Sequence, residues 1–272
     1  MKRIILITVA IISGLAASTS CCNNSGYGYE IKDGVAIYNT PDRPADQISM
    51  IGFAVEPLET VRIGVIGLGM RGPNAVNRFA NIDGTDILAI CDLYPEKLER
   101  TQQILERNGR ARAAEYSGTE GWKQLCDRED LDLVYIVTPW DSHTPIAVYA
   151  MEKGKHVAIE VPAATTIDEC WQLVNTAEKT RRHCMMLENC VYDFFELTTL
   201  NMAQHGLFGE IIHTEGAYIH NLDPYWNNYQ DNWRYVFNQK NRGDVYPTHG
   251  LGPACWALDI HRGDRMTTLV AM

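Results

Sequence analysis

The stretch Gly67-Leu68-Gly69-Met70-Arg71-Gly72 decides the fold, and it directly follows the apolar run Val61-Arg62-Ile63-Gly64-Val65-Ile66. The apolar run predicts a buried strand, and the residues from 73 to 80 predict a helix after the turn. Each glycine has a physical reason. The first permits a tight turn, the second lets the backbone approach a pyrophosphate, and the third lets the helix pack closely on the strand. The start of the helix offers free N–H groups and a positive dipole end, so the pattern predicts a phosphate-binding turn.

Asp92 indicates which dinucleotide this turn binds. It lies 20 residues after Gly72, at the end of the next predicted strand, Asp86–Cys91. A carboxylate at that place accepts hydrogen bonds from two ribose hydroxyls and repels a 2′-phosphate. The glycine motif alone is a weak signal, but the strand–turn–helix context and the spaced aspartate together predict an NAD site. NAD is therefore expected rather than NADP.

Strands and helices alternate outward from this turn. Continuous apolar strands between helices are typical of a parallel sheet that is covered on both faces. The predicted class is α/β, with a doubly wound Rossmann sheet in a domain over residues 61–189. Further strands are expected over 131–137, 156–159 and 184–187, and helices over 95–107, 144–152 and 168–179.

The pattern changes after residue 190. Helices are expected over 192–205 and 247–258, and strands over 210–220 and 266–272. The last strand finds no partner in the sequence that remains, and an unpaired strand is an exposed edge. We therefore expect residues 190–272 to begin an α+β domain with an open sheet that is truncated in this sequence. A natural C-terminal edge strand is the alternative.

The first residues are typical of a secretory signal. A basic start is followed by an apolar run over 4–12 and by small residues that lead to Cys21-Cys22. The apolar run is shorter than the roughly 20 residues that span a bilayer. We expect a lipoprotein signal over 1–22, lipidation at Cys21, a leader over 23–60, and a periplasmic or membrane-anchored bacterial lipoprotein. A plain signal peptide that is cut nearby is the alternative.

Composition and spacing exclude several classes of partner. The chain has 24 Lys and Arg against 34 Asp and Glu, a net charge of −10, and no long basic run. Nucleic-acid binding requires cations to neutralise phosphates, so no nucleic-acid partner is expected. The cysteines after Cys22 form no CxxC or spaced Cys/His pattern, so no metal site is expected.

Two more strand ends carry polar residues toward the predicted cofactor crevice, since ligands bind outside the carboxyl ends of parallel strands. They are Thr138-Pro139-Trp140-Asp141-Ser142-His143 and Glu160-Val161-Pro162. His143 has the alternative of merely capping the following helix. Residues 218–246 are rich in aromatic and amide side chains, which suit the C–H face and the hydroxyls of a sugar. Packing is the alternative role for most of these aromatics.

Several of these runs resemble a known family. Val137–His143 and Gly154–Pro162 resemble the Gfo/Idh/MocA family, which joins a Rossmann domain to an open-faced α+β substrate domain. More narrowly, Gly67–Gly72, Trp140–His143, Glu160–Pro162 and Tyr246–His249 resemble its glycosyl hydrolase family 109 branch, the NAD-dependent α-N-acetylgalactosaminidases. The resemblance covers residues 61–272. Val161 and Val245 stand where the dehydrogenases of the broader family usually have lysine and aspartate, which favours the hydrolase branch.

The resemblance and the glycine motif together imply two sets of site residues. One set binds the cofactor and the other binds the sugar. In the sugar set the resemblance implies that His249 is the proton acceptor, whereas without the resemblance a structural role is the simpler interpretation of this histidine. Its place at a helix start would favour the neutral form that accepts a proton. The cofactor set is Gly67, Gly69, Met70, Arg71, Gly72, Asp92, Trp140, Asp141, Ser142, His143, Glu160, Val161 and Asn189. The sugar set is Tyr218, Arg234, Tyr246, Pro247, Thr248 and His249.

The implied activity is removal of terminal α-N-acetylgalactosamine through transient oxidation at C3, elimination, addition of water and reduction. The implied partner is an α-GalNAc-terminated glycan. A membrane is expected to be contacted only through a lipid anchor, and whether the protein forms a homo-oligomer is left open. Two alternatives remain, an NAD-dependent sugar or polyol dehydrogenase and a non-catalytic sugar-binding lipoprotein. Export favours the hydrolase, because an enzyme that regenerates its own NAD in each cycle needs no cellular pool of the cofactor.

Overall fold

A computed structural model describes residues 6–7, 29–33, 35–38, 42–221, 223–225, 233–241 and 246–270. The chain forms two compact units. One, called here the Rossmann unit, consists of Ala45–Glu188 and His220–Tyr246. The second unit consists of Met1–Pro44, Asn189–Ile219 and Pro247–Met272.

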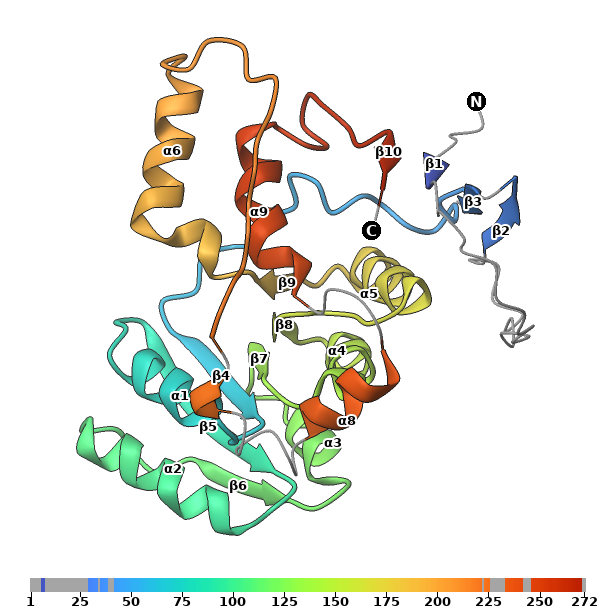
Figure 1. Cartoon of the computed structure of the whole chain (residues 1–272). Helices are drawn as coiled ribbons and strands as arrows, with labels where there is room; N and C mark the ends of the chain where they lie inside the picture. Colours follow the sequence, from blue (N-terminus) through green and yellow to red (C-terminus); the bar gives the residue numbers. More distant parts are fainter. Residues whose placement is uncertain are drawn as a thin grey trace. The chain divides into compact units, whose positions relative to one another are not determined.

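The Rossmann unit is built on a six-stranded parallel sheet in the order β6-β5-β4-β7-β8-β9 (Figure 1). From β4 the chain first adds β5 and β6 on one side, and then adds β7, β8 and β9 on the other. The strand order therefore reverses between β4 and β7, which is where open α/β sheets bind ligands. The strands are β4 Val61–Ile66, β5 Thr85–Asp92, β6 Ala114–Ser117, β7 Leu133–Ile136, β8 His156–Glu160 and β9 Cys184–Leu187. The predicted fold class is confirmed.

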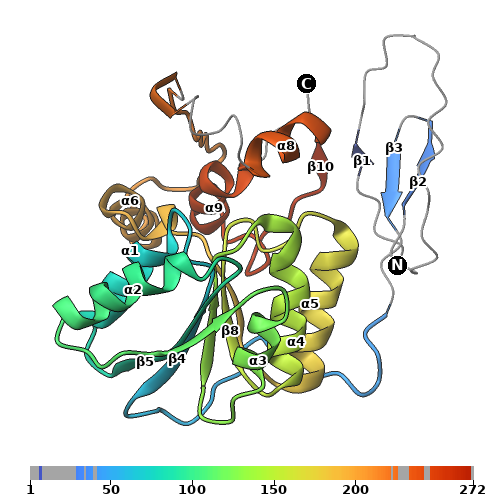
Figure 2. The ribbon, with the colours of Figure 1, turned by 90° about the horizontal axis from the view of Figure 1, so that it is seen from below.

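Helices cover both faces of this sheet (Figure 2). α1 (Gly72–Ala80) and α2 (Glu96–Arg107) lie on one face, and α3 (Gly121–Cys126), α4 (His143–Glu152) and α5 (Ile167–Thr180) lie on the other. Successive side chains of a strand point to opposite faces. Along β7, Tyr135 therefore packs with the α1 side of the core, while Val134 and Ile136 pack with the α4 side. All three are at most 2% exposed, and this double burial explains the continuous apolar runs.

Part of the predicted leader belongs to the Rossmann unit. Arg181, which follows α5, donates from Nη1 to the carbonyl of Ile48 at 2.7 Å. Its guanidinium lies 4.3 Å from the centre of the Phe53 ring, and Met50 packs against the core. Earlier residues of that leader form an antiparallel pair in the second unit, β2 (Tyr29–Lys32) with β3 (Val35–Tyr38). The Pro- and Asp-rich composition of the leader gave no sign of these contacts.

The second unit contains α6 (Phe194–Gln204), α9 (Pro247–Ala257) and the short helix η2 (Cys190–Tyr192). The predicted strand over 210–220 is wrong, since residues 211–221 have no regular secondary structure. A strand needs a ladder partner for its backbone groups, and the described part of the chain supplies none there. The predicted final strand shrinks to β10 (Thr268–Leu269), which pairs in parallel with β1 (Leu6–Ile7).

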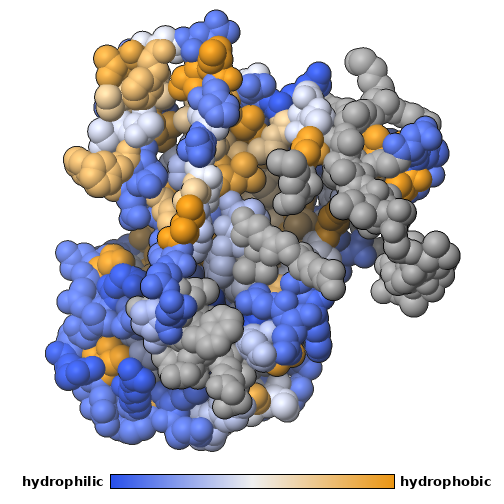
Figure 3. Space-filling model, in the orientation of Figure 1, coloured by the Kyte–Doolittle hydropathy of each residue, from blue (hydrophilic) through white to orange (hydrophobic). Residues whose placement is uncertain are grey.

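The surfaces of the two units differ in character. Hydrophobic residues gather over α6, where Phe194 is 76% and Phe195 is 77% exposed, whereas the Rossmann helices present mostly hydrophilic side chains (Figure 3). Among the residues described, no helix combines the length and the apolar character needed to cross a membrane.

Candidate cofactor and sugar site

The glycine turn joins β4 to α1, and its three glycines are required for different reasons. Gly67 has a φ of +103°, and a Cβ there would lie 2.6 Å from the carbonyl oxygen of Val137. A Cβ on Gly72 would lie 2.1 Å from the carbonyl oxygen of Gly67. A Cβ on Gly69 would meet no described atom within 4 Å. Gly67 and Gly72 thus shape the turn, while Gly69 leaves its backbone open to a ligand.

Asp92 ends β5, and the structure fastens its carboxylate on both sides. Oδ2 accepts the N–H of Leu68 at 2.7 Å, and Oδ1 accepts the N–H of Tyr94 at 3.0 Å. Lys97 Nζ lies 3.2 Å from Oδ1. The carboxylate is only 7% exposed. Two carboxylate oxygens offer about four acceptor directions, so a further direction remains for a ribose hydroxyl.

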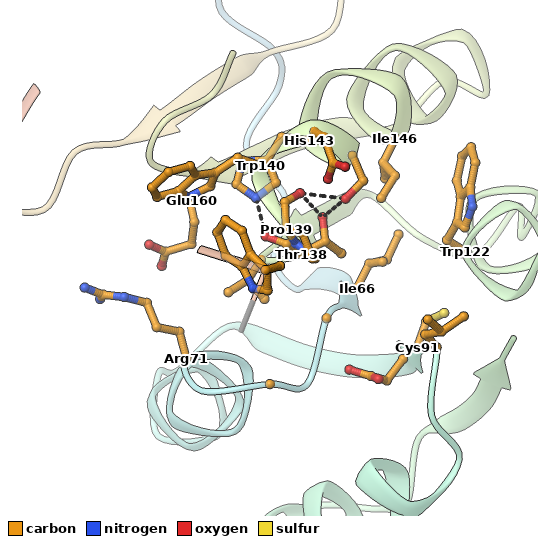
Figure 4. A pocket seen from close by; sticks show the side chains of 18 of the residues that line it. Ile66, Arg71, Cys91, Trp122, Thr138, Pro139, Trp140, His143, Ile146 and Glu160 are labelled. Atoms are coloured by element: carbon orange, nitrogen blue, oxygen red, sulfur yellow. Dashed lines mark hydrogen bonds between the residues drawn. The ribbon is translucent and has the colours of Figure 1, made fainter. Parts of the chain in front are cut away.

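A cavity of about 850 Å³ lies at the carboxyl ends of the strands and within the Rossmann unit. Its volume falls within the range of small-molecule and cofactor pockets. Figure 4 shows side chains from the ends of β4, β5, β7 and β8 around this cavity. The predicted cofactor residues that line it are Gly67, Gly69, Met70, Arg71, Asp92, Trp140, Asp141, Ser142, His143, Glu160 and Val161. An open Gly69, an anchored acid and a cavity at the switch point fit a dinucleotide.

His143 joins two of the loops that form the cavity. Its ring is 1% exposed. Nδ1 lies 2.8 Å from the carbonyl oxygen of Pro162, and Nε2 lies 2.8 Å from that of Thr138. Burial lowers the pKa of His143, and the two carbonyl contacts oppose this effect. The alternative that His143 merely caps α4 is wrong, because its ring instead connects the segments that follow β7 and β8.

Glu160 ends β8 and receives a buried hydrogen bond that the sequence analysis did not anticipate. The hydroxyl of Tyr135 on β7 donates to Glu160 Oε1. Burial raises the pKa of Tyr135, and the nearby charge of Glu160 raises it further. The tyrosine therefore stays protonated and fixes the orientation of the carboxylate at the cavity wall. The available signal was a single tyrosine in an otherwise aliphatic strand.

An aromatic cluster around Trp140 places two predicted sugar residues at the same cavity. Trp140 is 2% exposed, and its ring makes edge contacts with Trp233 at 4.8 Å and with Tyr246 at 5.2 Å. The guanidinium of Arg234 lies 5.3 Å from the Trp140 ring and donates to the hydroxyl of Tyr246. Trp233 and Arg234 begin α8 (Trp233–Lys240). Arg234 and Tyr246 line the cavity together with the cofactor residues. Trp233 also lines it; it belongs to the aromatic-rich stretch noted in the sequence but was not one of the predicted site residues.

The remaining predicted sugar residues belong to the second unit. His249 is 4% exposed, and its ring centre lies 4.4 Å from that of Tyr218. The backbones of Gly216 and Gly250 cross closely beside this pair, since a Cβ on Gly216 would lie 2.1 Å from the carbonyl oxygen of Gly250. The two glycines thereby bring Tyr218 against His249. Pro247, Thr248 and the predicted cofactor residue Asn189 are also in this unit.

Some predicted positions fall outside the described residues. These are Cys21, Cys22, Val245 and the amide- and aromatic-rich stretch over 226–232. Among the described cysteines, Cys91 and Cys126 are buried, and burial raises the pKa of each thiol to about 12. Such thiols are unreactive, in keeping with a structural role.

A parallel sheet that reverses order beside a glycine turn and an anchored aspartate defines a dinucleotide-binding Rossmann domain. Residues 61–188 match the family model described as "Oxidoreductase family, NAD-binding Rossmann fold", and residues 192–272 match "Glycosyl hydrolase 109, C-terminal domain". The chain belongs to the Gfo/Idh/MocA family, in its glycosyl hydrolase family 109 branch, and its cofactor is NAD.

Individual relatives agree with this assignment. The chain is 58% identical to glycosyl hydrolase family 109 protein 1 of Bacteroides thetaiotaomicron, over 100% of this chain and 58% of the relative. It is 63% identical to a glycosyl hydrolase family 109 protein of Porphyromonas gingivalis, over 86% of this chain and 50% of the relative. The chain thus spans about half the length of the curated relatives it matches. An NAD-binding protein from Listeria innocua shares the fold, with a TM-score of 0.55 at 23% identity over 72% of this chain and 54% of that one.

Proposed function

We propose that this protein is an NAD-dependent glycosidase that removes terminal α-N-acetylgalactosamine from glycans. The observation that carries the proposal is the shared cavity of the Rossmann unit. Arg234 and Tyr246, which the resemblance implies for the sugar, line the same cavity as Asp92 and Glu160. A sugar held there by the guanidinium and the phenol would lie beside the cofactor residues.

The proposed chemistry divides between the cofactor and the chain. NAD would supply reversible oxidation of the C3 hydroxyl to a ketone, which acidifies the proton on C2. His249 accepts that proton, and the bond between C1 and the leaving oxygen breaks by elimination. Water then adds at C1, a proton returns to C2, and the C3 hydroxyl is restored. Tyr218, whose ring packs on His249, holds the imidazole in place.

The carboxylates of the cavity support this route over the usual one. Most glycosidases use two carboxyl groups on either side of the scissile bond. Three carboxylates line the described cavity, those of Asp92, Asp141 and Glu160. Asp92 is engaged by the turn and by Lys97, and Glu160 is engaged by Tyr135, so only Asp141 stands outside these contacts and the lining offers no second carboxylate to pair with it. Val161 stands where a dehydrogenase would use lysine to assist the reacting hydroxyl, which weakens the dehydrogenase alternative.

We further propose that the protein acts after export, on glycans outside the cytoplasm. The support is the apolar run before Cys21-Cys22, which is typical of a lipoprotein signal. A lipid anchor would then be its only contact with the membrane.

The proposal is tested with an α-GalNAc arylglycoside, while aglycone release and NADH absorbance are followed together. We expect aglycone release without net accumulation of NADH. An oxidised sugar that accumulates together with NADH would instead identify a dehydrogenase. Sugar binding without either product would identify a binding protein.

A further inference from the structure

Lys97 brings a positive charge to the adenosine end of the cavity. It is the second residue of α2, and a short loop separates this helix from Asp92 at the end of β5. Its Nζ lies 3.2 Å from Asp92 Oδ1 and 4.7 Å from the centre of the Tyr94 ring. The lysine side chain is 38% exposed and lines the cavity beside the aspartate.

The two members of this pair have opposite consequences for a 2′-phosphate on the adenosine ribose. A carboxylate at the end of this strand binds the 2′-hydroxyl and repels a phosphate, whereas a cation nearby accommodates the phosphate. Rossmann domains usually present one or the other. Here both are present, and Asp92 pairs with the cation directly.

The two members of the pair are held to different degrees. Asp92 is anchored by the N–H groups of Leu68 and Tyr94, so its carboxylate stays where a 2′-phosphate would have to lie. Lys97 has a flexible, partly exposed side chain that turns toward whichever anion is nearest. The neighbouring acid Glu99 is engaged by Arg112 at 2.7 Å and does not compete for the lysine.

We propose that Lys97 is a specificity-determining residue, a latent ligand for the 2′-phosphate of NADP that Asp92 masks. The preference for NAD then depends on a single carboxylate. Once that negative charge is removed, the ammonium group of Lys97 binds the 2′-phosphate, and NADP becomes a ligand of the same cavity.

The test compares five proteins freed of nucleotide, with NAD and NADP binding measured by calorimetry at low and high salt. They are the parent, Asp92→Asn, Lys97→Met, the double variant Asp92→Asn/Lys97→Met, and Lys153→Met. The asparagine keeps one oxygen that accepts the Leu68 N–H, which retains the contact with the glycine turn, and gives up the hydrogen bond from the Tyr94 N–H. Lys153 pairs with Asp127 at 2.7 Å away from the cavity lining, which makes it a matched control for loss of a lysine.

Asp92→Asn should bind NADP about 10- to 100-fold more tightly than the parent, the range of a charge-assisted hydrogen bond. This gain should shrink at high salt and disappear in the double variant. Lys97→Met alone should leave NADP affinity within about threefold of the parent, because Asp92 already masks this lysine. Lys153→Met should do the same, because Lys153 does not line the cavity.

Two results would overturn the proposal. One is a folded Asp92→Asn protein, judged by its thermal unfolding, that gains no affinity for NADP. The other is a gain that persists in the double variant, which would assign the phosphate to another cation such as Arg71. If the asparagine variant fails to fold, Asp92→Ser replaces it with the same expectations, because its hydroxyl also accepts a backbone N–H.

Discussion

Substitution of Gly69 and Gly72 by alanine should separate cofactor binding from the stability of the turn. In Gly72→Ala the new methyl group would lie 2.1 Å from the carbonyl oxygen of Gly67, so the turn must open. Overpacking of this kind costs about 1–3 kcal/mol, which should lower the melting temperature by about 2–8 °C. In Gly69→Ala the methyl group meets no described atom within 4 Å and projects where the backbone faces the cavity. Its stability should stay within about 0.5 kcal/mol of the parent, while NAD binding should fall at least about 100-fold.

The assay for this pair is thermal unfolding with and without NAD, together with calorimetric binding of NAD. Gly263→Ala is the matched control, because a methyl group there would have an ordinary contact at 3.8 Å with Asp259. The control should change neither stability nor binding. The account of the turn would be refuted if Gly69→Ala bound NAD as the parent does. It would also be refuted if Gly72→Ala were as stable as the control.

The remaining predictions concern the ribose acid, an ion pair and the N-terminus. Asp92→Ala should purify with less bound NAD than the parent, and unchanged retention would remove Asp92 from the site. The hydrogen bonds from Arg62, at 2.6–2.9 Å, lower the pKa of Asp132. Their stabilisation is therefore full above the ordinary carboxyl pKa of about 4 and is lost as the pH falls through the lowered value. Asp132→Asn should cost about 1–2 kcal/mol in the free energy of unfolding at neutral pH, and the difference from the parent should close in acid; a pH-independent difference would contradict this. When cells are fed a fatty-acid analogue, the parent protein should become labelled, and Cys21→Ala or Cys22→Ala should abolish that labelling. If the protein is still labelled in each of the two variants, the lipoprotein proposal is refuted.

The inner strands β4, β5, β7 and β8 could be predicted from the sequence because they are largely buried on both faces and are therefore continuously apolar. The edge strand β6, Ala114–Ser117, was not predicted, because its side chains alternate between partly buried and exposed positions. The limits of β9, Cys184–Leu187, agree with the prediction, and β4 agrees over Val61–Ile66. The glycine turn could be predicted as well, because Gly67 and Gly72 stand where the chain leaves no room for a Cβ, and Gly69 leaves the backbone open to a ligand. The segment over 211–221 misled the prediction, because alternating apolar residues indicate a strand only where a partner strand is available.

The contacts that complete the cavity could not be predicted, because they join distant parts of the chain. Trp140 meets Trp233 across 93 positions, and nothing in the local pattern of α8 indicates that neighbour. The hydrogen bond from Tyr135 to Glu160 depends on two strands lying side by side in register, which only the sheet order supplies. The pairing of Lys97 with Asp92 depends on a side-chain rotamer, and sequence spacing does not determine rotamers.

The most direct test of the central proposal is mass spectrometry of the sugar released in heavy water. If the C3 hydroxyl is oxidised transiently, the C2 proton leaves before the glycosidic bond breaks, and solvent replaces it. The released N-acetylgalactosamine should then carry one deuterium at C2, without net NADH. His249→Ala should slow release by about 10²–10⁴-fold, the range usual for loss of a general base. Hydrolysis that leaves the original hydrogen at C2 would contradict the redox-elimination mechanism.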